Sequence, residues 1–145
     1  MGLVLQKFSD YFSGGVTLAG CAAVLLAFSP AAQAVSDFSS SCIQGEEIRL
    51  GAIYAGSTHG RPAGGRVSCA NSHKSPATWH KYTSDSDRIL RLRATSPFFD
   101  TVLSVHETCA STISSREIAC DDDGGSAYNA ELSFKAQAGH TYYVR

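Results

Sequence analysis

The chain has 145 residues, 43% of them hydrophobic and 17% charged, a balance typical of one folded domain and not of a disordered tail. Twelve Lys and Arg against thirteen Asp and Glu leave a formal net charge of −1. Nucleic acid and anionic membranes are therefore not expected as partners on electrostatic grounds. The thirteen Gly and four Pro favour turns and strands over a helical bundle.

The first 34 residues have the layout of a secretory signal peptide. Lys7 gives a basic start, Val16–Phe28 forms an apolar core, and Ala32-Gln33-Ala34 is an A-x-A cleavage site. A membrane-spanning helix needs about 20 apolar residues, more than this core provides. We therefore predict a signal peptide at 1–34, a mature domain at 35–145, and no membrane span after cleavage.

Another processing route lies inside the same segment. Leu18-Ala19-Gly20-Cys21 has the spelling of a bacterial lipobox, which would leave Cys21 lipidated. The apolar run of a lipoprotein signal precedes its Cys, whereas here Ser13-Gly14-Gly15 precedes Cys21 and the apolar residues follow it. Cleavage after Ala34 is the favoured interpretation.

Four cysteines remain in the predicted mature chain: Cys42, Cys69, Cys109 and Cys120. An even number of cysteines in an exported chain predicts disulfides. Three pairings are possible, and we expect the sequential one, Cys42 with Cys69 and Cys109 with Cys120, because it needs no crossing of the chain. A zinc site is disfavoured, since no two of these cysteines form a C-x-x-C pair.

The mature chain has the hydrophobic periodicity of strands. Apolar residues alternate with polar or small ones over 48–54, 90–94 and 132–136, and β-rich runs cover 101–105 and 140–144. Clusters of Gly or Ser separate these runs, and no helical stripe of three turns is present. The pattern predicts an all-β fold, an antiparallel β-sandwich.

Several motifs together resemble the bacterial pre-peptidase C-terminal (PPC) domain and its PPC-like relatives. They are the runs Phe99–Val105, Ala119–Gly124, Leu132–Phe134 and Ala138–Arg145, with Cys109 between the first two, and Ala77–Tyr82 upstream. The resemblance covers about Cys42 to Arg145, and it departs from the family pattern at Ala77 and His80. It implies a jelly-roll-like sandwich that lacks its last strand and is attached to secreted peptidases or other exported proteins, without catalysis of its own.

One acidic run is a candidate metal site. Asp121, Asp122 and Asp123, joined by Asp100, could offer the oxygen ligands that Ca²⁺ prefers, although the spacing is not that of an EF-hand. The alternative is an Asp/Gly turn whose carboxylates accept hydrogen bonds from backbone N–H groups. Calcium is the only cofactor that the sequence suggests.

No catalytic residues are predicted. None of the five histidines lies in H-E-x-x-H, and no serine lies in G-x-S-x-G. We expect His80 to be a hydrogen-bonded, half-buried strand residue and Trp79 to belong to the core or its rim. Arg91 and Arg93 form a basic stripe that protects an edge strand or contacts an anionic polymer.

The expected function is that of a non-catalytic accessory or binding module of an exported bacterial protein, either secreted, periplasmic or on the cell surface. It would assist folding or secretion of a hydrolase, or hold its macromolecular substrate. The alternatives are the N-terminal part of a truncated secreted peptidase and an adhesin-like sandwich that binds carbohydrate or collagen. Extracellular protein or polysaccharide is the expected partner.

Overall fold

The structure is a computed structural model, and it describes residues 2–7, 42–71, 74–109 and 116–145. These residues form strands and no helix, so the prediction of an all-β fold is confirmed. The strands are β1 (Gly2–Lys7), β2 (Glu46–Glu47), β3 (Ile53–Ala55), β4 (His80–Thr83), β5 (Arg88–Thr95), β6 (Leu103–His106), β7 (Glu117–Asp121), β8 (Ala130–Ala136) and β9 (Thr141–Val144). Within this described part, no helix could cross a membrane.

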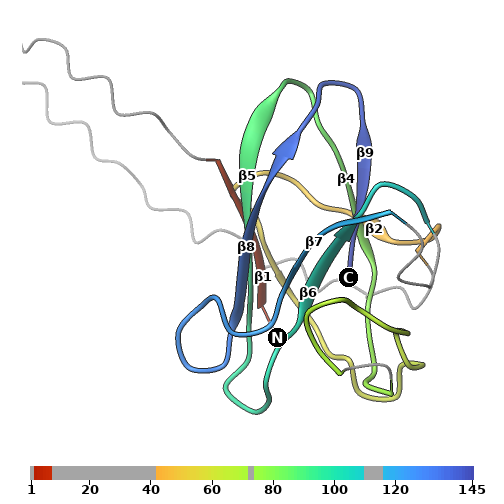
Figure 1. The fold of residues 1–145 in the computed structure, drawn as a ribbon, viewed down its shortest axis with the longest axis vertical. Helices are drawn as coiled ribbons and strands as arrows, with labels where there is room; N and C mark the ends of the chain where they lie inside the picture. Colours follow the sequence, from red (N-terminus) through yellow and green to blue (C-terminus); the bar gives the residue numbers. More distant parts are fainter. Residues whose placement is uncertain (1, 8–41, 72–73, 110–115) are drawn as a thin grey trace, which may run out of the picture.

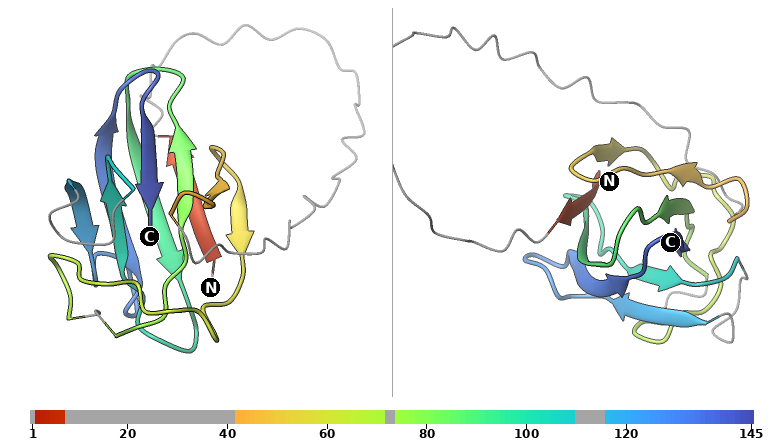
Figure 2. Two further views of the ribbon diagram at one scale, coloured as in Figure 1. Left: turned by 90° about the vertical axis from the view of Figure 1, so that its right-hand side faces the viewer. Right: turned by 90° about the horizontal axis from the view of Figure 1, so that it is seen from above.

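The strands form two sheets (Figures 1 and 2). The four-stranded sheet has the order β3-β1-β5-β8, and the five-stranded sheet has the order β2-β4-β9-β6-β7. All pairs are antiparallel except β2 and β4, which run parallel. The prediction of a purely antiparallel arrangement is wrong at this pair. The long connection from β2 to β4 passes through β3 in the other sheet, and such crossovers allow neighbouring strands to run parallel.

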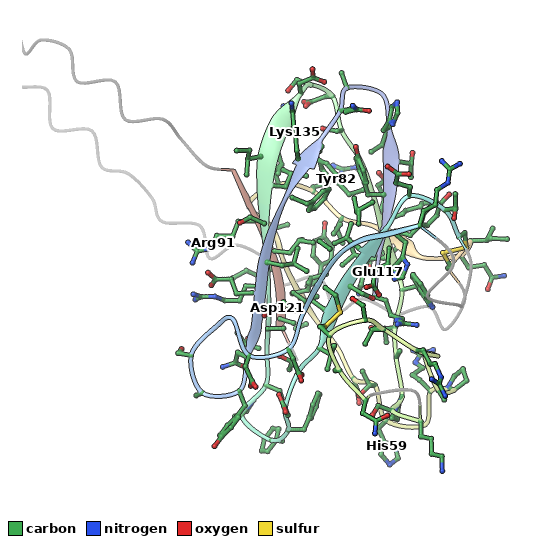
Figure 3. All side chains as sticks on the ribbon, viewed as in Figure 1. His59, Tyr82, Arg91, Glu117, Asp121 and Lys135 are labelled. Carbon is green, nitrogen blue, oxygen red and sulfur yellow. A yellow bond between two sulfur atoms is a disulfide. The ribbon has the colours of Figure 1, made fainter. Side chains whose placement is uncertain are left out.

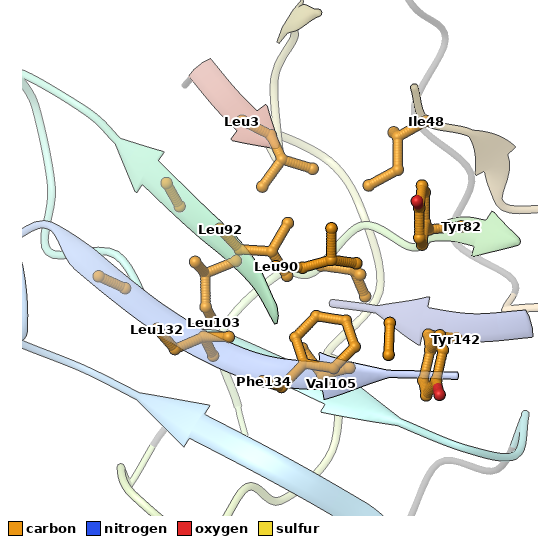
Figure 4. Packing of buried hydrophobic residues seen from close by; sticks show 14 of the residues in the cluster. Leu3, Ile48, Tyr82, Leu90, Leu92, Leu103, Val105, Leu132, Phe134 and Tyr142 are labelled. Atoms are coloured by element: carbon orange, nitrogen blue, oxygen red, sulfur yellow. The ribbon is translucent and has the colours of Figure 1, made fainter. Parts of the chain in front are cut away.

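Both sheets contribute to one hydrophobic core (Figure 4). The predicted alternation is observed in β5 and β8, where every second residue is buried. The core residues from the four-stranded sheet include Leu3, Tyr54, Leu90, Leu92, Ala94, Ala130, Leu132, Phe134 and Ala136, and those from the other sheet are Tyr82, Leu103, Val105, Tyr142 and Val144. The alternation therefore correctly identified the buried faces of β5 and β8, the two longest described strands.

The alternating segment 48–54 becomes a turn and a short strand instead of one long strand. Gly51 adopts a positive φ of 75°, a conformation that glycine tolerates and other residues rarely adopt. The amide of Ala52 donates to the carbonyl oxygen of Arg49 at 3.3 Å, and the Arg49 amide donates to the Tyr54 hydroxyl at 2.8 Å. This turn leaves only Ile53–Ala55 extended.

The disulfides join Cys42 to Cys109 and Cys69 to Cys120, with Cα separations of 5.5 and 5.6 Å. The sequential pairing that we expected is wrong. In the β6–β7 hairpin, Cys120 lies opposite Ser104, and Cys109 lies five positions further along the chain than Ser104. At about 3.3 Å per residue, the two hairpin cysteines are separated by on the order of 15 Å, too far for a bond.

Strand β1 lies inside the segment that the sequence predicts to be a signal peptide. The apolar core of that segment, Cys21 and the predicted cleavage site lie outside the described residues. Cleavage after Ala34 would remove β1 from the chain. We expect exported protein to begin at Val35, and N-terminal sequencing measures this directly. A lipid-bearing start at Cys21, or a retained Met1 in a membrane fraction, would contradict the predicted cleavage.

Candidate binding site at one end of the sheets

Three connections lie together at one end of the molecule, the lower end in Figure 1. They are the β3–β4 connection (residues 56–79), the β5–β6 loop (96–102) and the β7–β8 loop (122–129). Loops at the end of a rigid sheet scaffold are common positions for binding residues. The loops also carry three of the four predicted Asp residues, with Asp121 at the adjoining end of β7, and the most exposed aromatic side chains.

Hydrogen bonds fasten the β5–β6 loop to the β7–β8 loop. The Thr101 amide donates to the Tyr128 carbonyl oxygen at 3.1 Å, and the Ser96 amide donates to the side-chain oxygen of Asn129 at 3.0 Å. The buried Thr101 hydroxyl donates to the Ala94 carbonyl at 3.1 Å and accepts from the Ala130 amide at 2.8 Å. The two loops therefore form one fixed surface.

This surface carries three exposed aromatic residues, which we call the aromatic tip: Phe98, Phe99 and Tyr128. Their exposed fractions are 90%, 46% and 73%. Ala127 and Tyr128 have positive φ values of 56° and 60°, a region that residues other than glycine rarely adopt and that costs on the order of 1 kcal/mol or more each. Tyr128 is thus held in a strained backbone conformation while its ring stays exposed to solvent.

A cavity of about 550 Å³ lies beside the aromatic tip. Phe99, Asp100 and Val102 line it on one side, and the β3–β4 connection lines it on the other. That connection is held in place by the Gly64 amide, which donates to the Ser75 carbonyl at 3.0 Å, and by the Ala77 amide, which donates to the Pro62 carbonyl at 3.2 Å. The volume is within the range of small-ligand sites.

Arg145 forms a buried wall of the cavity. Its guanidinium donates to the carbonyl oxygens of Gly64 and Arg66 and lies 5.3 Å from the centre of the Trp79 ring, a cation–π geometry. Burial lowers the pKa of Arg145, and the carboxylate of Glu117 partly opposes this shift. The Arg145 side chain thus holds the β3–β4 connection against Trp79, which is itself in the core as predicted.

The predicted acidic residues lie at the same end, where Figure 3 labels Asp121. Asp121 accepts hydrogen bonds at one carboxylate oxygen from the Gly124 amide at 2.7 Å and from the Glu131 amide at 2.8 Å. Burial raises the pKa of Asp122, and the neighbouring charges of Asp100, Asp123 and Asp121 raise it further. The structure therefore brings the four carboxylates within electrostatic range of one another.

The Asp121 contacts are those of the Asp/Gly turn that the sequence offered as the alternative to calcium. Among the described residues, no three His, Cys, Asp or Glu side chains are placed so that they could hold a metal ion. The calcium interpretation stays a prediction.

Calcium titration tests this prediction. If the four carboxylates bind Ca²⁺, an excess of a hundredfold over Kd stabilises the fold by about 2.7 kcal/mol and raises the melting temperature by several degrees. Asp122→Asn is expected to remove most of that gain. The melting temperature in EDTA should stay equal or rise, because the substitution relieves carboxylate repulsion. Equal calcium effects on both proteins, or none, would show that the loop is an Asp/Gly turn.

The four histidines that the structure describes lie in different surroundings. His59 and His140 are exposed. His80 is 1% exposed, and so more buried than we predicted. The His106 Nε2 atom lies 2.9 Å from the Ser104 hydroxyl, a Ser–His contact that the sequence motifs missed because no nucleophile signature surrounds it. Both residues are 1% exposed, and Ser104 is also among the residues that line the cavity.

The basic stripe is partly neutralised within the protein, because its two arginines and the neighbouring Arg88 pair with two carboxylates. Arg91 and Arg93 both form ion pairs with Glu131 of the neighbouring strand β8, and Arg88 pairs with Asp85. Strand β5 lies between β1 and β8, so these arginines do not protect a sheet edge as the sequence suggested. The Arg91 and Arg93 charges instead form a cross-strand contact on the outer face.

The structure defines an all-β domain with two disulfides and an exposed loop surface at one end. No family model matches the sequence, and neither the curated proteins nor the solved structures contain a match. The PPC resemblance thus rests on the sequence motifs alone and is not an assignment of family.

Proposed function

We propose that this protein is a non-catalytic binding module of an exported bacterial protein, and that it holds a macromolecule at the aromatic tip. The single observation that carries the proposal is the exposure of Phe98 and Tyr128 on two loops that hydrogen bonds fasten together. Exposed aromatic side chains with a fixed backbone lose little conformational entropy when they bind.

Export is supported by the two disulfides, which indicate an oxidising environment such as the periplasm or the cell exterior. The predicted signal peptide agrees with that environment. The module would serve a secreted hydrolase as an accessory domain, as the PPC resemblance implies.

The neighbouring charges favour a polysaccharide or an uncharged protein surface as the ligand. Asp100 and Asp123 are exposed beside the aromatic tip, and carboxylates repel anionic polymers while they accept hydrogen bonds from hydroxyl and amide groups. Aromatic rings can stack on sugar rings or on apolar side chains. The tip thus combines the two contacts that such ligands need.

A pull-down on insoluble polysaccharide and on collagen tests the proposal. We expect the wild-type chain to be retained on one of these materials. Phe98→Ala combined with Tyr128→Ala should reduce retention at least about tenfold, since two hot-spot aromatics commonly contribute more than 1 kcal/mol each.

The matched control is Ile43→Ala, which removes an apolar side chain that is 76% exposed and does not belong to the three loops. Retention of this variant should equal that of the wild type. If the double variant is retained as well as the wild type, or if neither material retains the wild type, the proposed function of the aromatic tip is wrong.

A further inference from the structure

Strand β1 is inserted between two strands that are distant from it in sequence. It pairs antiparallel with β5 along its whole length, Gly2–Lys7 opposite Leu90–Thr95, and with β3 over Gly2–Val4. In the described residues, β3 has no other strand partner in the sheet. Backbone groups on both sides therefore hold β1, which is the arrangement of a bound peptide strand.

One side chain of β1 enters the core. Leu3 is 2% exposed and lies opposite Tyr54 of β3 and Ala94 of β5. Figure 4 shows Leu3 directed toward the interior near Leu92. We call the space between β3 and β5 the strand slot. It includes an apolar position beside Tyr54 and Ala94, which we call the seat of Leu3 and which fits a side chain of leucine size.

The rest of the domain is connected without β1. Both disulfides join residues between Cys42 and Cys120. The five-stranded sheet does not contain β1, and β5 pairs with β8 over seven residues on its other side. Removal of β1 would therefore expose the slot-facing edge of β5 and the seat of Leu3, while these cross-links and pairings stay in place.

We propose that the strand slot is a binding site for an extended peptide segment with an apolar side chain at the position of Leu3. In this structure Gly2–Lys7 occupies it in cis. After the predicted cleavage at Ala34 detaches β1, a strand of another exported polypeptide takes its place. An open slot would leave the edge of β5 unpaired, and such edges pair readily with other chains.

The chemistry of the slot defines this partner. Backbone hydrogen bonds to β3 and β5 provide affinity for any extended segment, and the seat beside Tyr54 and Ala94 selects an apolar residue at one position. A charged residue at that position would be buried without a partner, which is strongly unfavourable. The site lies on a different part of the domain from the aromatic tip and does not depend on it.

The test uses the full-length chain with Leu3→Asp, which prevents β1 from occupying the slot. A fluorescent peptide with the sequence of residues 1–8 is titrated and its anisotropy measured. We expect the Leu3→Asp chain to bind this peptide. The affinity of the wild type for the peptide should be at least about tenfold lower, because its own strand competes for the slot. The same peptide carrying Leu3→Asp should not bind.

The control chain is Ile43→Asp, which makes the same change at an exposed position and should behave like the wild type. Should Leu3→Asp fail to fold, a protease site that replaces residues 35–41 allows β1 to be cut loose after folding. The released segment should stay bound and exchange with the labelled peptide.

Three outcomes would overturn the proposal. One is a folded Leu3→Asp chain that does not bind the peptide, and another is equal binding by the wild type and this variant. The third is a dimer in size-exclusion chromatography formed by exchange of β1, which would make a second copy of the chain the occupant. A Leu3→Asp chain that also carries Phe98→Ala and Tyr128→Ala should bind the peptide as well as Leu3→Asp alone, so failure of the aromatic-tip proposal is separable from failure of this one.

Discussion

Simultaneous replacement of Cys69 and Cys120 by alanine is expected to lower the free energy of unfolding by about 4 kcal/mol. The two cysteines are 51 residues apart in sequence, and in the chain-entropy model a cross-link over a loop of this size restricts the unfolded state by about that amount. The loss is a large share of the stability of a small domain. Denaturant titration of both proteins under oxidising conditions measures it.

Reduction provides the control for this measurement. With a strong reductant present, the wild type and the variant should unfold at nearly the same denaturant concentration, because neither chain then contains the cross-link. Peptide mapping without reduction should recover the links Cys42–Cys109 and Cys69–Cys120. Recovery of a Cys109–Cys120 peptide would contradict the pairing and the position of the β3–β4 connection over β7.

The stability of the fold is also expected to fall as the pH drops below 6.5, through His80. Burial lowers the pKa of His80 from its ordinary value of 6.5 to about 4. Between these values the unfolded chain binds a proton that the folded chain does not, so acid favours unfolding. At 1.36 kcal/mol for each unit, the full loss is roughly 3 kcal/mol. The contribution of His80 is constant above pH 6.5 and again below pH 4.

Unfolding measurements between pH 7 and pH 5 isolate this effect from most carboxylates, which titrate below that range. The wild type should lose roughly 2 kcal/mol over this interval. His80→Phe, a ring of similar size that does not titrate, should lose much less. NMR titration of the His80 ring in the wild type gives an independent value. A folded-state pKa near 6.5, or equal pH slopes for both proteins, would exclude His80 as the cause.

Local sequence patterns correctly identified the all-β class and the core faces of two strands. The alternation of Leu90, Leu92 and Ala94, and that of Leu132 and Phe134, predicted which faces are buried, because a strand places successive side chains on opposite sides of a sheet. The pattern failed at 48–54, where Gly51 and the Tyr54 hydroxyl stabilise a turn. Alternation of apolar and polar residues does not reveal a turn that is stabilised by a hydrogen bond from a side chain several residues away.

The candidate site could be predicted only in part. The sequence grouped Asp100 with Asp121–Asp123, and in the structure the charges of Asp100, Asp121 and Asp123 raise the pKa of Asp122, while their role as a calcium site stays a prediction. It did not identify the aromatic tip, because the burial of an aromatic residue depends on what the rest of the chain packs against it. Trp79 is in the core, whereas Tyr128 is exposed on a strained loop, and the residue types alone do not distinguish these positions.

By itself, the sequence determined the all-β class and the presence of disulfides, because strand periodicity and cysteine number are properties of the chain. The tertiary structure decided the pairing Cys42–Cys109 and Cys69–Cys120, the parallel β2–β4 pair and the place of β1 between β3 and β5. These features join segments tens of residues apart. The way in which the two sheets pack around one core decides which segments pair. This long-range packing cannot be recognised from a local sequence pattern.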